Sequence, residues 1–395
     1  MKLGKWDIRI KSHYFAGLVV MVLFTAALFL TGRNNDVVLV EEIARNVDRK
    51  TGPSCNDSVF RCNLFSGKWV FDGVSNTLYE EKKCSFMTNE FACEKYGRKE
   101  FKYQKWRWQP HQCDLPRFNG SSFMEKIRGK RVVFVGDSLI RNQWISMLCM
   151  IESSLHPSSS KAVEYNATIE FYWSPLLVES NCDDPYSHRI KDRTVRIKSI
   201  EKHARHWTDA DILIFNSFMW WLEPNMTILW GSFGSSDAIY KRVETNLRLY
   251  EMALNTWSEW LEININRTKT KLFFMSLSPY HFQGESLNEG HCYNVTEPIM
   301  KEDYWGISTD IDMMRTAEST IQKLEKRGLK AEYLNITHLS DYRRDAHTSI
   351  YRKFGDLSDD QLSNPKSYSD CVHWCLPGVP DVWNQIFYSY IINSS

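Results

Sequence analysis

The sequence predicts an α/β fold in which helices cover both faces of a parallel sheet. Short apolar runs that are typical of buried strands occur at 131–135, 168–173, 211–215 and 271–277. Segments with helical character lie between or after these runs, at 139–151, 240–263, 312–326 and 380–392. Apolar strands that alternate with helices indicate a parallel sheet buried on both faces. A chain of 395 residues is long enough to bury a core of this kind.

The first strand leads into a tight turn and a helix. Arg131–Val135 is followed by Gly136, Asp137 and Ser138, after which the helical segment begins. Glycine allows the tight turn. A serine at a helix start lies where unpaired backbone N–H groups and the positive end of the helix dipole stabilise a developing oxyanion. Ser138 is therefore a candidate nucleophile, and an ordinary helix cap is the alternative interpretation.

A second candidate group lies near the C-terminus, where Asp370 and His373 are three residues apart. A local turn would let the carboxylate hold one ring nitrogen and leave the other to accept the proton of Ser138. Cys371 and Cys375 bracket the histidine, and disulfides at both would hold this loop rigid. The alternative is a histidine that only packs beside its neighbours.

Asn216 directly follows the apolar run that ends at Phe215. In a parallel sheet, functional side chains gather at the carboxyl ends of the strands, so Asn216 should emerge on the same rim as Ser138. Its amide would be suited to donate to an oxyanion. A turn residue at the end of a strand is the alternative.

The N-terminal region has the features of a membrane anchor. Residues 12–32 contain no Asp, Glu, Lys or Arg, and as a helix they would span about 30 Å, roughly one bilayer core. Residues 1–11 are rich in Lys and Arg, which predicts a cytosolic N-terminus. We expect a cytosolic tail (1–11), a transmembrane signal anchor (12–32) and a polar stem (33–54). A cleaved signal peptide is the alternative.

Cysteines and glycosylation sequons indicate a luminal chain. All 10 cysteines follow the expected anchor, and an even number in a luminal protein predicts disulfides. Half of them lie in 55–119, which we expect to form a Cys-rich N-terminal lobe before a catalytic domain at 120–395. No CxxC pair has zinc spacing, so no metal is expected. Predicted glycosylation sites, usable only in a lumen, are Asn56, Asn119, Asn166, Asn225, Asn266, Asn294, Asn335 and Asn393.

The overall charge is nearly balanced, with 49 Lys and Arg against 48 Asp and Glu. This balance predicts no strong attraction to nucleic acid or anionic lipid, so a neutral partner is favoured. The chain also contains 15 Trp. Aromatic rings suit the apolar faces of sugars, although core packing is the alternative for each of them.

The motifs resemble those of the plant trichome-birefringence-like proteins, polysaccharide O-acetyltransferases related to the GDSL/SGNH esterases. The similar stretches are Cys62–Val70, Lys105–Pro110, Cys113–Phe118, Val135–Leu139, Arg141–Trp144, Glu179–Asn181, Phe215–Asn216, Trp220–Trp221 and Asp370–Asn384. Together they cover about residues 60–392, and the GDS and DxxH blocks are the most specific. The regions 172–207 and 230–233 are most similar to the xylan-modifying branch.

The resemblance implies an SGNH-like doubly wound sheet with Ser138, Asp370 and His373 as a catalytic triad. Asn216 and the Ser138 amide would form the oxyanion hole, with Arg141 and Asn181 as further oxyanion or substrate residues. The implied disulfides are Cys62–Cys113, Cys84–Cys149, Cys93–Cys371 and Cys292–Cys375. Cys55 and Cys182 lie outside that pattern and are left as a further candidate pair.

The function implied by the resemblance is transfer of an acetyl group, through a serine acetyl-enzyme, to 2-O or 3-O hydroxyls of xylosyl residues in cell-wall xylan. The protein would be a single-pass type II Golgi membrane protein. It would need no permanently bound cofactor, and an acetyl donor such as acetyl-CoA would be a co-substrate.

Four alternatives remain open from the sequence. The acceptor could be mannan, xyloglucan or pectin, or the same residues could release acetate as a polysaccharide acetylesterase. The pair Asp209 and Asp211 imitates the metal-binding motif of a Golgi glycosyltransferase, although it precedes its strand. The last alternative is a non-catalytic protein that binds a wall polymer.

Overall fold

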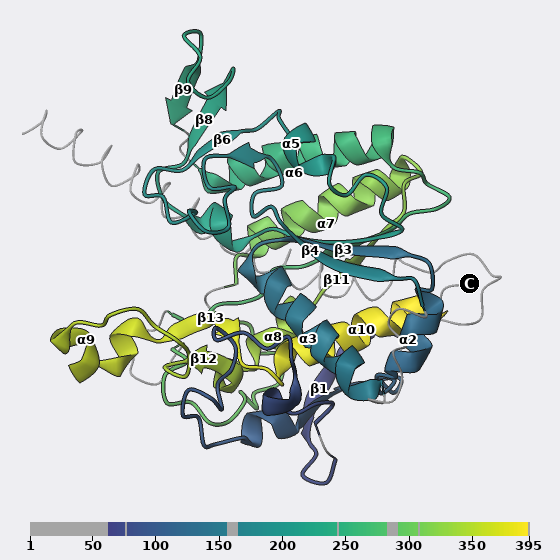
Figure 1. Ribbon diagram of the computed structural model, residues 1–395, viewed down its shortest axis with the longest axis vertical. Helices are drawn as coiled ribbons and strands as arrows, with labels where there is room; N and C mark the ends of the chain where they lie inside the picture. The colour runs from purple at the N-terminus through teal and green to yellow at the C-terminus, as the bar shows by residue number, and fades with distance from the viewer. Residues whose placement is uncertain are drawn as a thin grey trace, which may run out of the picture. The chain divides into compact units, whose positions relative to one another are not determined.

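A five-stranded parallel sheet is the centre of the fold. The computed structural model describes residues 62–75, 77–155, 165–242, 245–282, 291–306 and 309–393. Within these residues the strand order is β11-β10-β7-β3-β4, and Figure 1 labels β11, β3 and β4 of this sheet. The strands are β3 (Arg131–Gly136), β4 (Thr168–Trp173), β7 (Ile212–Asn216), β10 (Lys271–Met275) and β11 (Ala331–Leu334). The predicted parallel sheet is confirmed.

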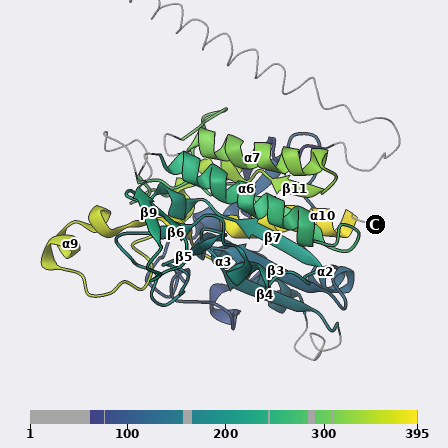
Figure 2. The same ribbon diagram turned by 90° about the horizontal axis from the view of Figure 1, so that it is seen from above.

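Helices pack on both faces of this sheet, as predicted (Figure 2). One face is covered by α6 (Asn246–Asn264) and α7 (Ile311–Lys326), and the other by α2 (Gly120–Lys126), α3 (Ser138–Ser154) and α10 (Val379–Asn393). Alternate residues of a strand point to opposite faces. Val132 and Phe134 therefore enter the core beneath α3 and α10, while Val133 and Val135 enter the core beneath α6 and α7.

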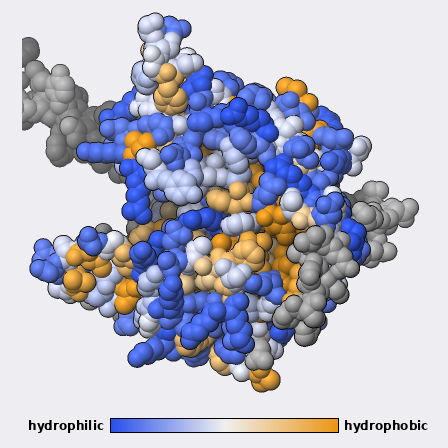
Figure 3. Space-filling view, in the orientation of Figure 1, coloured by the Kyte–Doolittle hydropathy of each residue, from blue (hydrophilic) through white to orange (hydrophobic). Residues whose placement is uncertain are grey.

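One of the four predicted helices begins later than expected. The helix expected at 240–263 begins only at Asn246, because Ile239–Arg242 pairs with Thr227–Trp230 as an antiparallel strand. On the face seen in Figure 3, apolar residues gather near the middle, over the region of α3, with hydrophilic surface above and below.

The turn between β3 and α3 positions the candidate nucleophile. A Cβ atom at Gly136 would lie 2.1 Å from the carbonyl oxygen of Asn216, so only glycine allows β3 and β7 to approach this closely. Asp137 then caps α3, since its carboxylate accepts a hydrogen bond of 2.8 Å from the Leu139 amide. Ser138 therefore begins the helix at the carboxyl edge of the sheet.

Smaller elements surround the central sheet. The antiparallel pairs are β1 (Gly67–Phe71) with β2 (Trp106–Pro110), and β12 (His347–Ser349) with β13 (Asp370–Trp374). A four-stranded sheet contains β5 (Glu179–Ser180), β6 (Thr194–Arg196), β8 (Thr227–Trp230) and β9 (Ile239–Arg242). Short α-helices are α5 (Glu201–Ala204), α8 (Thr337–Asp341) and α9 (Asp359–Ser363). Single 3₁₀ turns lie at Glu81–Lys83, Lys102–Lys105, Met219–Leu222, Arg344–Ala346 and Pro365–Tyr368.

The described part of the Cys-rich segment packs against the same core as the main sheet. Trp69 and Trp108, on β1 and β2, are buried with residues of α3 and α10. The indole N–H of Trp69 donates to the Leu339 carbonyl at 2.7 Å. Residues 62–395 accordingly form one compact unit.

Two predicted disulfides are confirmed and two are wrong. Cys62–Cys113 and Cys84–Cys149 are formed as expected. The predicted pairs Cys93–Cys371 and Cys292–Cys375 are exchanged, because the structure joins Cys93 to Cys375 and Cys292 to Cys371.

Backbone pairing explains the exchange. His281 donates its amide to the Cys371 carbonyl and accepts from the Cys292 amide, which brings Cys292 beside Cys371. The Leu376 amide donates to the Phe91 carbonyl, which brings Cys375 beside Cys93. Cys182 is buried and forms no disulfide among the described residues, and Cys55 lies outside them.

The expected N-terminal segments at 1–11, 12–32 and 33–54 lie outside the described residues. Among the helices that are described, none is both long and apolar enough to cross a membrane. Asn56 also lies outside the described residues, and glycosylation at the other seven sites stays a prediction. One of those sites has a structural role, because the Asn119 side chain accepts a hydrogen bond from the Ser122 amide and caps α2.

Candidate active site

Ser138, His373 and Asp370 meet in one hydrogen-bonded series. The Oγ of Ser138 lies 2.8 Å from Nε2 of His373, and Nδ1 of the same ring lies 2.8 Å from Oδ2 of Asp370. The serine comes from the start of α3, whereas the other two residues lie on β13. The structure therefore brings together the three side chains that the sequence had suggested as a triad.

Local contacts hold β13 in the required place. Oδ1 of Asp370 accepts from the amides of Val372 and His373, both at 3.0 Å, which leaves Oδ2 free to face the imidazole. Asn142 lies one helical turn after Ser138 and exchanges two hydrogen bonds with the backbone of Trp374, at 2.9 and 3.2 Å. Asn142 thus ties the helix of the nucleophile to the strand of the histidine.

Arg352 is a member of the site that the sequence reasoning missed. Its guanidinium forms an ion pair with Oδ2 of Asp370 and lies 3.2 Å from Nδ1 of His373. Nδ1–H and the guanidinium are both donors and cannot hydrogen-bond to each other, so both donate to Oδ2 of Asp370. No motif marks Arg352, which lies in an irregular segment that follows β12.

The electrostatics of the site keep the imidazole neutral. Burial lowers the pKa of His373 to about 3, and the positive charge of Arg352 adds to this effect. A neutral ring is the form that can accept the proton of Ser138. Burial also raises the pKa of Asp137 to about 6, and Oδ2 of this carboxyl has no hydrogen-bond partner among the described residues.

Asn216 lies where it was predicted, but its amide is already occupied. It ends β7 beside Gly136 and is only 4% exposed. Its Nδ2 donates to the carbonyls of Met275 and Ser276, at 3.2 and 3.0 Å. Both amide hydrogens are therefore used by the end of β10, and in this arrangement Asn216 cannot donate to an oxyanion.

The other two predicted site residues have different surroundings. Arg141 forms an ion pair of 2.9 Å with Glu90, and its charge acts on His373. It is thus close to the triad. Its Nε is buried and has no hydrogen-bond partner among the described residues. Asn181 donates to the Asp192 carbonyl at 3.0 Å and accepts from the Thr194 amide at 2.9 Å, so its side chain braces the loop before β6.

Aromatic side chains flank the rim that carries Ser138. Trp173 ends β4 opposite Gly136, and Trp220 follows β7. Their rings are 5.4 Å apart and nearly perpendicular, and the His188 ring lies 5.0 Å from Trp173 and 5.4 Å from Trp220. All three side chains are half-buried. They form what we call the aromatic rim, defined by Trp173, Trp220 and His188.

A charged residue next to the aromatic rim, Arg189, acts on Arg352 beside Asp370. Burial lowers the pKa of Arg352, Glu90 counteracts this, and the positive charges of Arg189 and Arg141 add to the lowering. Arg189 directly follows His188 in the chain. The loop that carries His188 is therefore close to the guanidinium beside Asp370.

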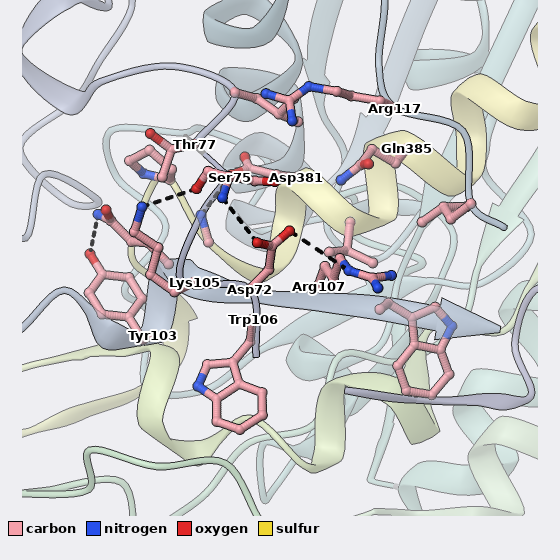
Figure 4. Close-up of a pocket in the computed structure, with 17 residues that line it drawn as sticks. Asp72, Ser75, Thr77, Tyr103, Lys105, Trp106, Arg107, Arg117, Asp381 and Gln385 are labelled. Carbon is pink, nitrogen blue, oxygen red and sulfur yellow. Dashed lines mark hydrogen bonds and ion pairs between the residues drawn. The ribbon is translucent and has the colours of Figure 1, made fainter. Parts of the chain in front are cut away.

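A separate cavity of about 240 Å³ lies between β2 and the start of α10 (Figure 4). No triad residue lines it. The Asp72 carboxylate points toward Arg107, at 3.8 Å, and accepts from the Ser75 amide at 3.0 Å. These polar groups of the cavity are thus engaged with one another and take no part in the hydrogen-bonded series of Ser138.

Potential metal ligands among the described residues include the group His291, Cys292 and Cys371. The two cysteines are joined in a disulfide, which removes the thiolates that a metal would need. This group is therefore a disulfide with a neighbouring histidine.

Comparison with known proteins agrees with this geometry. Residues 115–390 match the GDSL/SGNH-like acyl-esterase family found in Pmr5 and Cas1p, and residues 60–114 match the PMR5 N-terminal domain. Protein trichome birefringence-like 34 of Arabidopsis thaliana is 51% identical, with 98% of this chain and 97% of that protein covered. Xylan O-acetyltransferases 14 and 12 of Oryza sativa subsp. japonica are 48% and 47% identical. They cover 84% and 88% of this chain, and 77% and 73% of their own lengths are matched. The chain therefore belongs to the trichome birefringence-like proteins within the GDSL/SGNH-like acyl-esterase family.

Proposed function

We propose that this protein is a polysaccharide O-acetyltransferase that acetylates 2-O or 3-O hydroxyls of xylosyl residues in xylan through an acetyl-Ser138 intermediate. The observation that carries the proposal is the series Ser138, His373 and Asp370, with both hydrogen bonds at 2.8 Å. The names of the two rice relatives support xylan as the acceptor.

The first half-reaction loads the serine. Oγ of Ser138 attacks the carbonyl carbon of the acetyl donor while its proton passes to Nε2 of His373. Asp370 and Arg352 face the other side of the ring, where the carboxylate stabilises the imidazolium that forms. The Ser138 amide, at the start of α3, is a donor for the oxyanion. The proton on His373 then leaves with the donor's leaving group, which is a thiol if the donor is acetyl-CoA.

The second half-reaction moves the acetyl group to the sugar. A xylosyl hydroxyl gives its proton to Nε2 of His373 and attacks the acetyl carbon, and Oγ of Ser138 regains the proton as the ester breaks. The aromatic rim supports a glycan acceptor, because indole rings pack well against pyranose faces. The nearly neutral chain fits an uncharged polymer.

The same chemistry supports one second candidate, a polysaccharide acetylesterase, because the family matched by residues 115–390 is described as acyl-esterase. Transfer and hydrolysis differ only in whether a sugar hydroxyl or water reaches the acetyl-enzyme.

We also propose a type II Golgi location with a luminal catalytic domain. The four disulfides among the described residues favour an oxidising compartment.

An acceptor assay tests the proposal. The purified full chain, incubated with acetyl-CoA and xylan oligosaccharides, should add the mass of one acetyl group to the sugar, and NMR should place it on O-2 or O-3. Ser138→Ala should abolish the product while leaving the melting temperature unchanged. Full activity in Ser138→Ala would contradict the mechanism, and release of acetate from acetylated xylan without any transfer would favour the esterase.

A further inference from the structure

Two buried histidines connect the main chain of His373 to a buried carboxylate. Nδ1 of His347 lies 3.0 Å from the His373 carbonyl oxygen, and Nε2 of His347 lies 2.7 Å from Nδ1 of His281. Nε2 of His281 then faces Asp341, at 3.1 Å from its carbonyl oxygen and 3.4 Å from Oδ1. His281, His347 and Asp341 are each at most 2% exposed.

Counting donors and acceptors fixes the number of protons on this chain of contacts. The His373 carbonyl can only accept, so Nδ1 of His347 carries a hydrogen. The main-chain carbonyl of Asp341 can also only accept, so Nε2 of His281 carries a hydrogen as well. A third hydrogen must lie between the two rings, since two lone pairs 2.7 Å apart would repel. Two neutral imidazoles hold only two such hydrogens, and the pair therefore carries one extra proton and one positive charge.

The two rings have different surroundings. Burial lowers the pKa of His347 well below its usual value, with the charge of His281 as the next cause. Arg98 also faces His347, donating to its carbonyl at 3.0 Å. His281 instead faces the Asp341 carboxylate, which supplies the countercharge. His281 thus lies between an anion and the ring of His347.

This charged pair lies directly against the catalytic strand. His347 stacks on Trp374 with ring centroids 3.9 Å apart, and the His281 amide donates to the Cys371 carbonyl at 3.0 Å. The two histidines therefore contact β13 two residues before His373, at His373 and one residue after it. A shift of this strand would change the 2.8 Å contact between His373 and Ser138.

We propose that His347, His281 and Asp341 are positioning residues, which hold one shared proton and through it fix the main chain of His373 against the nucleophile. The inference rests on the proposed function of His373 as the base for Ser138. A base displaced by about 1 Å loses up to about a hundredfold in rate, so a firm hold on its backbone has a catalytic consequence.

Two substitutions at one position separate this role from simple packing. In His347→Asn the amide nitrogen takes the place of Nδ1 and still donates to the His373 carbonyl, whereas in His347→Gln the side chain reaches His281 but loses that donation. With the full chain, we expect kcat for p-nitrophenyl acetate cleavage to fall about tenfold or more in His347→Gln and less than about threefold in His347→Asn. KM for xylan oligosaccharides should stay unchanged in both variants.

Further variants keep the test decisive. Ser278→Ala removes the 2.9 Å partner of the Trp374 indole without touching the proton chain, and should keep kcat within about twofold. If neither His347 variant folds, His281→Asn, which preserves donation to His347, should exceed His281→Gln in kcat. The inference would be overturned if the Asn and Gln variants at the same histidine had equal kcat. It would also be overturned if the losses in kcat followed only the melting temperatures. Undiminished cleavage by Ser138→Ala would instead overturn the proposed function.

Discussion

At the amino edge of the central sheet Arg131 and Asp211 form ion pairs, whereas at the carboxyl edge several buried polar atoms have no hydrogen-bond partner among the described residues. Arg131 at the start of β3 forms ion pairs with Glu170 at 2.7 Å and Asp209 at 2.9 Å, and Asp211 pairs with Lys269 at 3.1 Å. At the other edge, described polar atoms without a partner include Asp137 Oδ2, Asn216 Oδ1, Arg141 Nε and Arg352 Nε. Unpaired buried polar groups cost stability, and these four lie around the candidate nucleophile.

This difference bears on the glycosyltransferase alternative. Asp209 and Asp211 imitate a metal-binding motif in the sequence, but their carboxylates are engaged by Arg131 and Lys269. They also precede β7, whereas ligands of open parallel sheets bind beyond the carboxyl ends of the strands. The amino edge therefore has the features of a structural ion-pair network, and the carboxyl edge those of a reactive site.

The largest effect that would sharpen this contrast is expected from Asp370→Asn. The amide removes the charge that stabilises the imidazolium and can place its nitrogen toward Nδ1 of His373, which favours the wrong tautomer. We expect kcat for acetyl transfer to fall by about 10³- to 10⁴-fold, with an unchanged far-UV circular dichroism spectrum. A loss below about tenfold, measured by mass spectrometry of acetylated xylan oligosaccharides, would mean that Asp370 does not act on His373.

The next effect is expected from Arg352→Gln, with Lys353→Gln as the exposed control. Because the Arg352 charge helps to lower the pKa of His373, its removal raises that pKa. The protonated, inactive ring then appears at higher pH, and the acid limb of the kcat/KM profile should shift upward. Because burial still holds the pKa low, we expect about a twofold loss near pH 4 and almost none at pH 7.5. An unshifted acid limb would contradict this role of Arg352.

An effect of moderate size is expected from Trp220→Ala on the aromatic rim. Aromatic contacts contribute about 0.5–1.5 kcal/mol, so KM for xylan oligosaccharides should rise about two- to tenfold. Cleavage of p-nitrophenyl acetate should be unchanged, because that small donor does not need the glycan subsite. Trp305→Ala, which removes a partly exposed tryptophan stacked on His338, is the matched control and should leave KM unaltered. Equal KM changes in the two variants would remove the aromatic rim from acceptor binding.

The triad residues could be chosen from sequence because their signals are local. Gly136 before the nucleophile and the spacing of Asp370 and His373 each follow from short-range geometry, and the alternating apolar runs predicted the parallel sheet that joins them. The role of Arg352 could not be predicted in this way. It depends on a tertiary contact with Asp370, and nothing in its own segment distinguishes it from other arginines.

The errors have the same physical origin. Asn216 was correctly placed on the rim, but the engagement of its amide depends on the backbone of β10, a neighbour in space. Cys371 and Cys375 are both suitable disulfide partners by spacing, and only the backbone pairing around β13 assigns them. The sequence therefore identified the residue types and the edge of the sheet on which they lie. The choice among hydrogen-bond and disulfide partners depended on long-range contacts.

The smallest effect is expected at the amino edge, from Asp209→Asn. The Asp209 side chain is 81% exposed, and an exposed ion pair contributes at most about 1 kcal/mol. We expect acetyl transfer within about twofold of the unmodified protein, measured in parallel with and without added Mn²⁺, and a melting temperature lower by only a few degrees. Arg131 retains Glu170 as a partner, so the edge should stay intact. A large loss of activity, or manganese-dependent transfer from a nucleotide sugar that Asp209→Asn abolishes, would move the reactive site to this edge and break the contrast.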